Sequence, residues 1–165
     1  MPKNLVALAA SLLALASPAV LANQLYLDGS IGSAEAEAGP YDADDTFIRI
    51  GAGVTLNETI SAEAGFWDFG SARDGGVRIS ADALYGALKA GTDIGNGLHL
   101  YGRVGIMRWE AEAGRFDDDG FDLIFGGGIN YQVGPGRLGV ELHYGDMDEV
   151  DMRTIGVSYT LPIQI

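Results

Sequence analysis

The feature that most constrains this chain is the segment 98–109, LHLYGRVGIMRW, which alternates two kinds of side chain. In an extended strand, neighbouring side chains project from opposite faces, so every second residue shares a face. One face of this segment carries aliphatic groups, from Leu98, Leu100, Val104 and Ile106. The opposite face carries His99, Tyr101, Arg103 and Met107. An arginine therefore lies in the middle of a strand whose other face is suited to hydrocarbon.

Eight segments show this alternation of an apolar face with a face of glycine, small polar residues and an occasional charge. They are residues 24–33, 46–56, 60–70, 77–92, 98–109, 121–132, 138–145 and 154–161. The fourth is the least regular, because Arg78, Ser80 and Asp82 share one parity while Tyr85, Ala87 and Lys89 share the other. We expect a β-bulge near Ala83 to reconcile them. Glycine is frequent, 25 of 165 residues, and most of the glycines lie within these segments, which indicates tight curvature or a crowded inner face.

The connections between these segments alternate in length and composition. Residues 56–59, 92–97 and 133–137 are short and rich in turn-forming Asn, Gly and Pro, whereas 34–45, 71–76, 110–120 and 146–151 are longer or acidic. Tight turns at one end and polar loops at the other are typical of an up-and-down barrel. The sequence therefore predicts an all-β fold, an eight-stranded antiparallel transmembrane β-barrel with its acidic loops outside the cell.

The inner face of such a barrel is predicted to hold a network of ion pairs. A soluble ligand-binding barrel would also alternate, but its solvent-facing side should carry many Lys and Glu residues. Here the polar face has about one charge per strand, which suits a narrow, packed lumen. Single buried charges are costly, so we expect the lumen charges to pair with one another. The predicted network comprises Asp28, Arg49, Glu63, Lys89, Arg103 and Glu141.

Residues 1–22 have the pattern of a cleaved signal peptide, with Lys3, an apolar run and a small-residue exit. Residues 23–165 then form one barrel domain. The chain has no cysteine, so disulfides do not stabilise it. Its net charge of -13 argues against nucleic acid as a partner.

Three further groups of residues suggest sites. Aromatic residues near strand ends predict a membrane-interface girdle of Trp109, Tyr131, Tyr144 and Tyr159. Two acidic loops offer oxygen ligands of the kind that Ca²⁺ prefers, although solvated surface charge explains them more simply. The residues of this candidate divalent-cation site are Asp117, Asp118, Asp119, Asp122, Asp146, Asp148, Glu149 and Asp151.

No other cofactor is expected. For catalysis only the pair of His143 and Ser158 merits attention, and the histidine is more simply a hydrogen-bonding group of the lumen.

The segments YGRVGIMRW, GFDLIFGGGINYQV, RLGVELHY and TIGVSYTL resemble the OmpA-type eight-stranded transmembrane domain, most strongly over residues 97–161. The resemblance implies a Gram-negative outer-membrane protein, with the barrel-assembly machinery, membrane lipids and lipopolysaccharide as its partners. It implies no particular activity.

We therefore expect a monomeric outer-membrane protein without enzymatic activity, with a structural or surface-interaction role such as adhesion to a host surface or extracellular ligand. The alternatives are a small nonspecific pore, a soluble ligand-binding barrel and a lipid A-modifying enzyme.

Overall fold

The computed structural model describes residues 24–38, 41–74, 77–113, 116–147 and 150–163 of the chain. The predicted signal peptide, residues 1–22, lies outside the described residues. No helix in the described ranges is both long enough and apolar enough to cross a bilayer.

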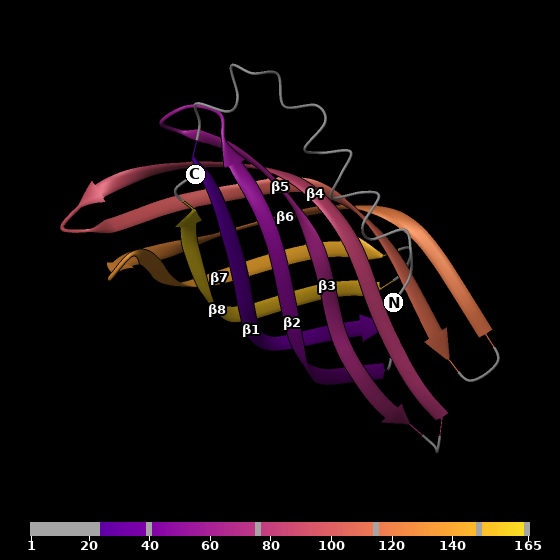
Figure 1. Cartoon of the computed structure of the whole chain (residues 1–165). Helices are drawn as coiled ribbons and strands as arrows, with labels where there is room; N and C mark the ends of the chain where they lie inside the picture. The colour runs from indigo at the N-terminus through magenta and orange to yellow at the C-terminus, as the bar shows by residue number, and fades with distance from the viewer. Residues whose placement is uncertain (1–23, 39–40, 75–76, 114–115, 148–149, 164–165) are drawn as a thin grey trace.

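Eight antiparallel strands close into a barrel in which each strand pairs with its neighbours in sequence and β1 pairs with β8. Figure 1 shows the strands wrapping around one axis, with tight turns gathered at one end and the β3–β4 and β5–β6 hairpins extending at the other. The strands are β1 Leu25–Ala38, β2 Tyr41–Thr55, β3 Ile60–Asp74, β4 Val77–Gly95, β5 Leu98–Ala113, β6 Phe116–Val133, β7 Gly136–Met147 and β8 Val150–Ile163. This architecture confirms the predicted fold class.

The three tight connections lie at the end of the barrel that we call the turn end. Between β2 and β3, the backbone N–H groups of Thr59 and Ile60 both donate to Asn57 Oδ1, at 2.9 and 2.8 Å. Between β4 and β5, Asn96 has a φ of 53°, a left-handed conformation that Asn tolerates better than most residues. The opposite end, where the remaining hairpins connect, is called the loop end.

The outward face of the barrel is apolar over most of its height. Exposed aliphatic and aromatic side chains include Ile50, Val104, Leu123 and Val157, each more than half exposed. Toward the loop end this surface gives way to carboxylates, since Asp68, Asp82, Glu110 and Asp119 lie opposite one another across β3 to β6. An apolar belt that ends in a charged row fits a barrel whose middle lies in hydrocarbon.

The predicted bulge near Ala83 is wrong, because β4 pairs with β5 without interruption from Ile79 to Asp93. The register instead shifts in β3, between Asp68 and Ser71, where Gly70 has a φ of 82°. The alternation of β4 places Asp82 on the outward face, so its carboxylate is exposed and is not buried in the lumen.

Inward-facing glycines make room for large side chains from other strands of the barrel. A Cβ at Gly53 would overlap the ring of Tyr26, and one at Gly156 would lie 2.6 Å from Cζ of Phe47. Such contacts are too close for a real side chain, so the ring of Tyr26 fills space left by Gly53 on the adjacent strand, and the ring of Phe47 fills space left by Gly156 two strands away. Gly53 and Gly156 therefore lie on a crowded inner face, as the sequence predicts.

Candidate functional site in the barrel interior

A layer of charged side chains fills the middle of the lumen. Arg49 Nη2 lies 2.5 Å from Asp28 Oδ1 and 2.8 Å from Glu141 Oε1, and its Nη1 lies 3.8 Å from Glu63 Oε1. Arg103 Nε lies 2.6 Å from Glu63 Oε1, with Asp28 and Glu141 each 3.6 Å from its Nη atoms. Each guanidinium thus faces all three carboxylates, and all five side chains are buried.

Hydroxyl groups add hydrogen bonds to this ionic layer. Tyr26 donates to Glu63 Oε2 at 3.1 Å and Tyr101 donates to Glu141 Oε2 at 2.9 Å. Thr160 donates to Asp28 Oδ2 at 2.7 Å, while Arg49 Nη1 donates to the Tyr85 hydroxyl at 2.8 Å. Because each buried carboxylate receives a hydroxyl donor as well as a guanidinium, the cost of removing it from water is offset by directed contacts.

Lys89 occupies the lumen as predicted, but it makes no ion pair within 4 Å among the described residues. Its ammonium lies 4.0 Å from the ring centroid of Tyr101 and 5.7 Å from that of Tyr26. These are cation–π distances. The two arginines hold the carboxylates at close range, so the expected pairing of Lys89 with a carboxylate is replaced by contact with tyrosine rings.

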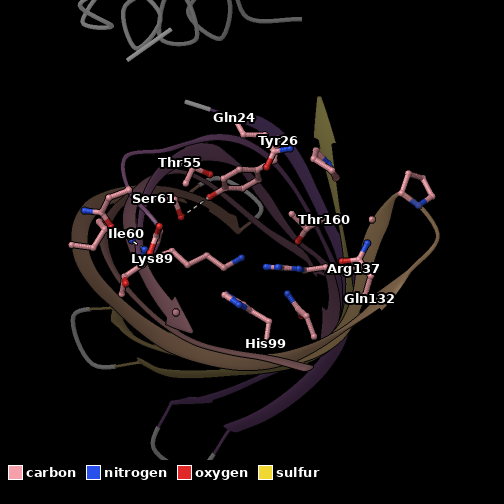
Figure 2. Close-up of a pocket in the computed structure, with 18 residues that line it drawn as sticks. Gln24, Tyr26, Thr55, Ile60, Ser61, Lys89, His99, Gln132, Arg137 and Thr160 are labelled. Atoms are coloured by element: carbon pink, nitrogen blue, oxygen red, sulfur yellow. Dashed lines mark hydrogen bonds between the residues drawn. The ribbon is translucent and has the colours of Figure 1, made fainter. Parts of the chain in front are cut away.

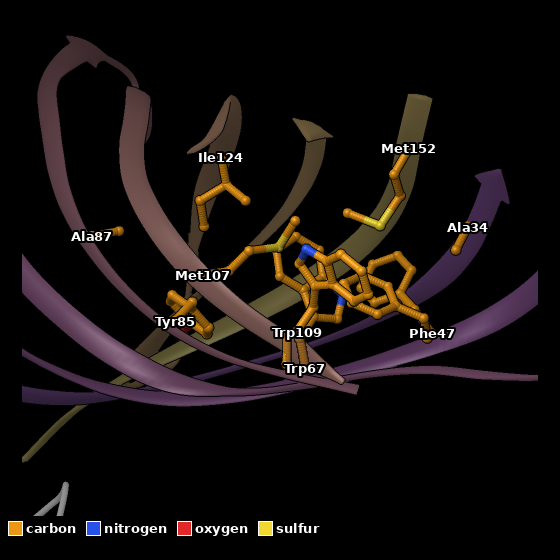
Figure 3. Packing of buried hydrophobic residues seen from close by; sticks show 11 residues of the cluster. Ala34, Phe47, Trp67, Tyr85, Ala87, Met107, Trp109, Ile124 and Met152 are labelled. Atoms are coloured by element: carbon orange, nitrogen blue, oxygen red, sulfur yellow. The ribbon is translucent and has the colours of Figure 1, made fainter. Parts of the chain in front are cut away.

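Toward the loop end, the ionic layer is covered by a cluster of apolar side chains that we call the plug. Trp67, Phe47 and Met107 are fully buried there, and Figure 3 shows them packed against one another across the lumen. The ring of Trp67 lies 5.8 Å from that of Phe47 and 5.1 Å from that of Phe69. The described side chains of the lumen therefore form a packed interior along this part of the axis.

Toward the turn end from the ionic layer lies a cavity of about 350 Å³. Its lining includes Tyr26 and Thr160, which hydrogen-bond to carboxylates of that layer. Figure 2 shows Lys89, His99 and Arg137 directed into the cavity from β4, β5 and β7. Its remaining walls are mostly polar, with Asn130 and Thr160 among them. The interior thus has three levels: a polar cavity, the ionic layer and the plug.

The structure separates the four aromatic residues predicted to form a girdle. Tyr131, Tyr144 and Tyr159 project outward near strand ends. Trp109 does not, which corrects the prediction for that residue. It is 6% exposed within the plug, and its indole N–H donates to Asp122 Oδ2. The parity of the strand places Trp109 with Arg103 and Met107 on the inward face.

The candidate divalent-cation site is only partly within the described residues. Asp119 is exposed beside Arg108, and Asp122 accepts the hydrogen bond from Trp109. No group of three or more possible metal ligands occurs among the side chains that the structure describes. Outside these described side chains are Asp117, Asp118, Asp146, Asp148, Glu149 and Asp151.

His143 lies between the ionic layer and the plug. Its Nε2 contacts Arg103 Nη1, its Nδ1 lies 3.4 Å from Thr154 Oγ1, and the edge of its ring meets Trp67. Ser158 is also buried, but no hydrogen bond joins it to His143. These contacts are those of a hydrogen-bonding group within the packed lumen.

Tyr26, Tyr85 and Tyr101 also lie on the inner face, where the alternation pattern alone assigns them no role. Their hydroxyls bond to the charged residues of the ionic layer. Each tyrosine is an even number of residues from Asp28, Lys89 or Arg103, so it shares the inward face with a charged residue. A phenol buried beside carboxylates needs a partner for its O–H, and this spacing could have identified the tyrosines as part of the layer.

Comparison with known proteins agrees with this geometry. Residues 5–161 match the family described as outer membrane protein beta-barrel domain. The chain belongs to this family. Membership implies a bacterial outer-membrane location, and the apolar belt fits it. None of the curated proteins matches the chain.

Among solved structures, the fold is similar to that of Neisserial surface protein A, with a TM-score of 0.70 and 15% identity over 83% of this chain and 96% of that chain. It is also similar to Ail, the attachment invasion locus protein of Yersinia pestis, solved with the heparin analogue sucrose octasulfate. That match has a TM-score of 0.65 and 11% identity over 86% of this chain and 99% of that chain. The barrel domain of OprF from Pseudomonas aeruginosa has a TM-score of 0.57 and 11% identity, over 84% and 99% of the two chains. At these identities the likeness shows the fold.

Proposed function

We propose that this protein is a monomeric outer-membrane barrel that acts through its outer surface and loops, with no transport or catalytic role. The observation that carries the proposal is the filled interior, in which the ionic layer lies directly beneath the plug. A lumen packed in this way blocks passage through the barrel, so partners outside the cell would meet the protein at its loop end. Closure of β1 onto β8 also leaves no free strand edge for pairing with a second copy.

The charge of the chain restricts the partner. The related Ail structure holds a sulfated heparin analogue, but a chain with a net charge of -13 would repel such a polyanion. We infer that the acidic loops favour a cationic surface, or an anionic one bridged by divalent cations, as at lipopolysaccharide. The candidate residues are Asp117, Asp118, Asp119, Asp122, Asp146, Asp148, Glu149 and Asp151.

Attachment of whole cells tests this proposal. Cells that express the protein should adhere to cultured epithelial cells more strongly than cells that lack it. A variant in which Asp117, Asp118 and Asp119 are replaced by Asn should lose most of that gain, because it removes three loop charges. Glu58→Gln, at the opposite end, is the matched control and should adhere as the wild type does. Equal attachment with and without the protein would contradict an adhesive role.

The pore and enzyme alternatives make different predictions. Planar-bilayer recordings of the purified protein should show no reproducible conductance steps, since the ionic layer and plug fill the lumen. Deletion of the gene should leave the acylation of lipid A unchanged, because His143 and Ser158 are enclosed within the lumen. Regular conductance steps would favour the pore, and altered acylation would favour the enzyme.

A further inference from the structure

The cavity at the turn end differs in charge from the chain as a whole. Its lining contains the cationic side chains of Lys89 and Arg137 and a single carboxylate, that of Glu58. The complete chain, in contrast, has a net charge of -13. Among the side chains that line the cavity, cations thus outnumber carboxylates, and cationic groups within a concave, polar enclosure attract anions.

Lys89 is the residue that points most directly to a ligand. Its side chain is 7% exposed, and in the described part of the chain it makes neither an ion pair within 4 Å nor a hydrogen bond. The tyrosine rings attract the ammonium through cation–π contacts, but they offer its N–H groups no oxygen acceptor. Figure 2 shows this ammonium directed into the cavity. A buried ammonium with three available donors is costly unless an acceptor reaches it.

The opposite side of the cavity offers further donors. Arg137 reaches in from β7, and one of its terminal nitrogens lies 3.3 Å from Asp93 Oδ1. A guanidinium has five N–H donors, so this contact leaves several for a ligand. Asn130, 2% exposed, adds an amide to the same lining. Lysine and arginine together are the side chains that proteins most often use for phosphate.

The shape of the cavity limits how a ligand enters. The packed ionic layer and plug lie on the loop-end side of the cavity, so access is from the turn end, which faces the periplasm in an outer-membrane barrel. A volume of about 350 Å³ accommodates a small anion together with water. We propose that this cavity binds a small phosphate-bearing anion, with Lys89 and Arg137 as its cationic contacts.

Calorimetric titration tests the proposal directly. Inorganic pyrophosphate is added to the full protein folded in zwitterionic detergent micelles, and the wild type should bind it at one saturable site. Lys89→Met should weaken binding about tenfold or more, since one charge-assisted contact is lost. Arg137→Gln should weaken it about threefold, because that guanidinium is partly exposed and already contacts Asp93. Addition of short-chain phosphatidic acid then distinguishes the sources: competition identifies a lipid headgroup, and no competition identifies a free anion.

Arg108→Gln is the matched control, because Arg108 is an exposed arginine on the outward face and lies outside the cavity. It should bind pyrophosphate as the wild type does. Binding that falls equally in Arg108→Gln and Lys89→Met, or no saturable binding by the wild type, would overturn the proposal. Should Lys89→Met fail to fold, Arg137→Gln at the rim decides the matter, since unchanged affinity there would equally overturn it.

Discussion

Arg103 and Lys89 are both buried lumen cations, yet their surroundings differ. Arg103 lies within 4 Å of three carboxylates, whereas Lys89 rests against two tyrosine rings. Removal of one partner from a buried ion pair leaves an uncompensated charge, which costs more than the pair itself contributes. The two cations should therefore respond differently to the same substitution.

Arg103→Met should lower the free energy of unfolding by about 3–5 kcal/mol, because it deprives Glu63 of its nearest cation. Lys89→Met should cost less than about 2 kcal/mol, because the interaction lost is cation–π. Urea unfolding of the two variants in the same lipid vesicles measures both values. Equal losses would mean that close pairing with carboxylates does not distinguish the two sites.

Glycines on the two faces of the sheet provide a second comparison. A Cβ at Gly156 would lie 2.6 Å from Phe47 Cζ and 2.9 Å from the backbone oxygen of Ile31, whereas one at Gly86 would meet nothing within 4 Å. Gly156→Ala should destabilise the barrel by about 1–3 kcal/mol, through overpacking against the plug. Gly86→Ala should be neutral or slightly stabilising. Thermal unfolding followed by circular dichroism checks both, and a neutral Gly156→Ala would show that the plug is loosely packed.

At the scale of the strand, the outward face should respond to charge according to its depth in the membrane. Val104→Arg places a cation near the middle of β5 and should cost about 2–4 kcal/mol in lipid. Ile94→Arg, near the turn end of β4, is the matched control and should cost about 1 kcal/mol or less. Unfolding titrations in vesicles measure the difference. Similar small costs at both positions would argue that this face meets water.

The face of the sheet on which each side chain lies was predictable from the sequence. The level of each side chain along the barrel axis was not. Two-residue periodicity alone put Arg49, Glu63 and Glu141 on the inner face, and their contacts lie there. The separation of the interior into cavity, ionic layer and plug depends on the stagger between strands, which no single strand encodes. Trp109 shows the limit in another way: its position near a strand end suggested a girdle, but its parity and a hydrogen bond to Asp122 keep it inside. The bulge lies in β3, at Asp68 to Ser71, and not near Ala83. β4 needs no bulge, because its alternation is regular and Asp82 faces outward among the carboxylates toward the loop end.

At the scale of the whole molecule, closure connects the inward and outward faces. Every strand pairs on both sides, so the backbone satisfies its hydrogen bonds without water, as a sheet in hydrocarbon must. Apolar side chains are then free to face lipid, and the charges balance one another within: Arg49, Lys89 and Arg103 against Asp28, Glu63 and Glu141. The central claim is therefore that this chain folds with its polar groups inside and its hydrocarbon outside.

Migration of the protein in SDS gels, after extraction from outer membranes with detergent, tests that claim most directly. A closed barrel whose backbone bonds are all internal should resist SDS at room temperature and unfold only on boiling. We expect the unboiled protein to migrate as a compact, faster species and the boiled protein to migrate more slowly. Recovery in the soluble periplasmic fraction without detergent, with the same migration before and after boiling, would contradict the claim.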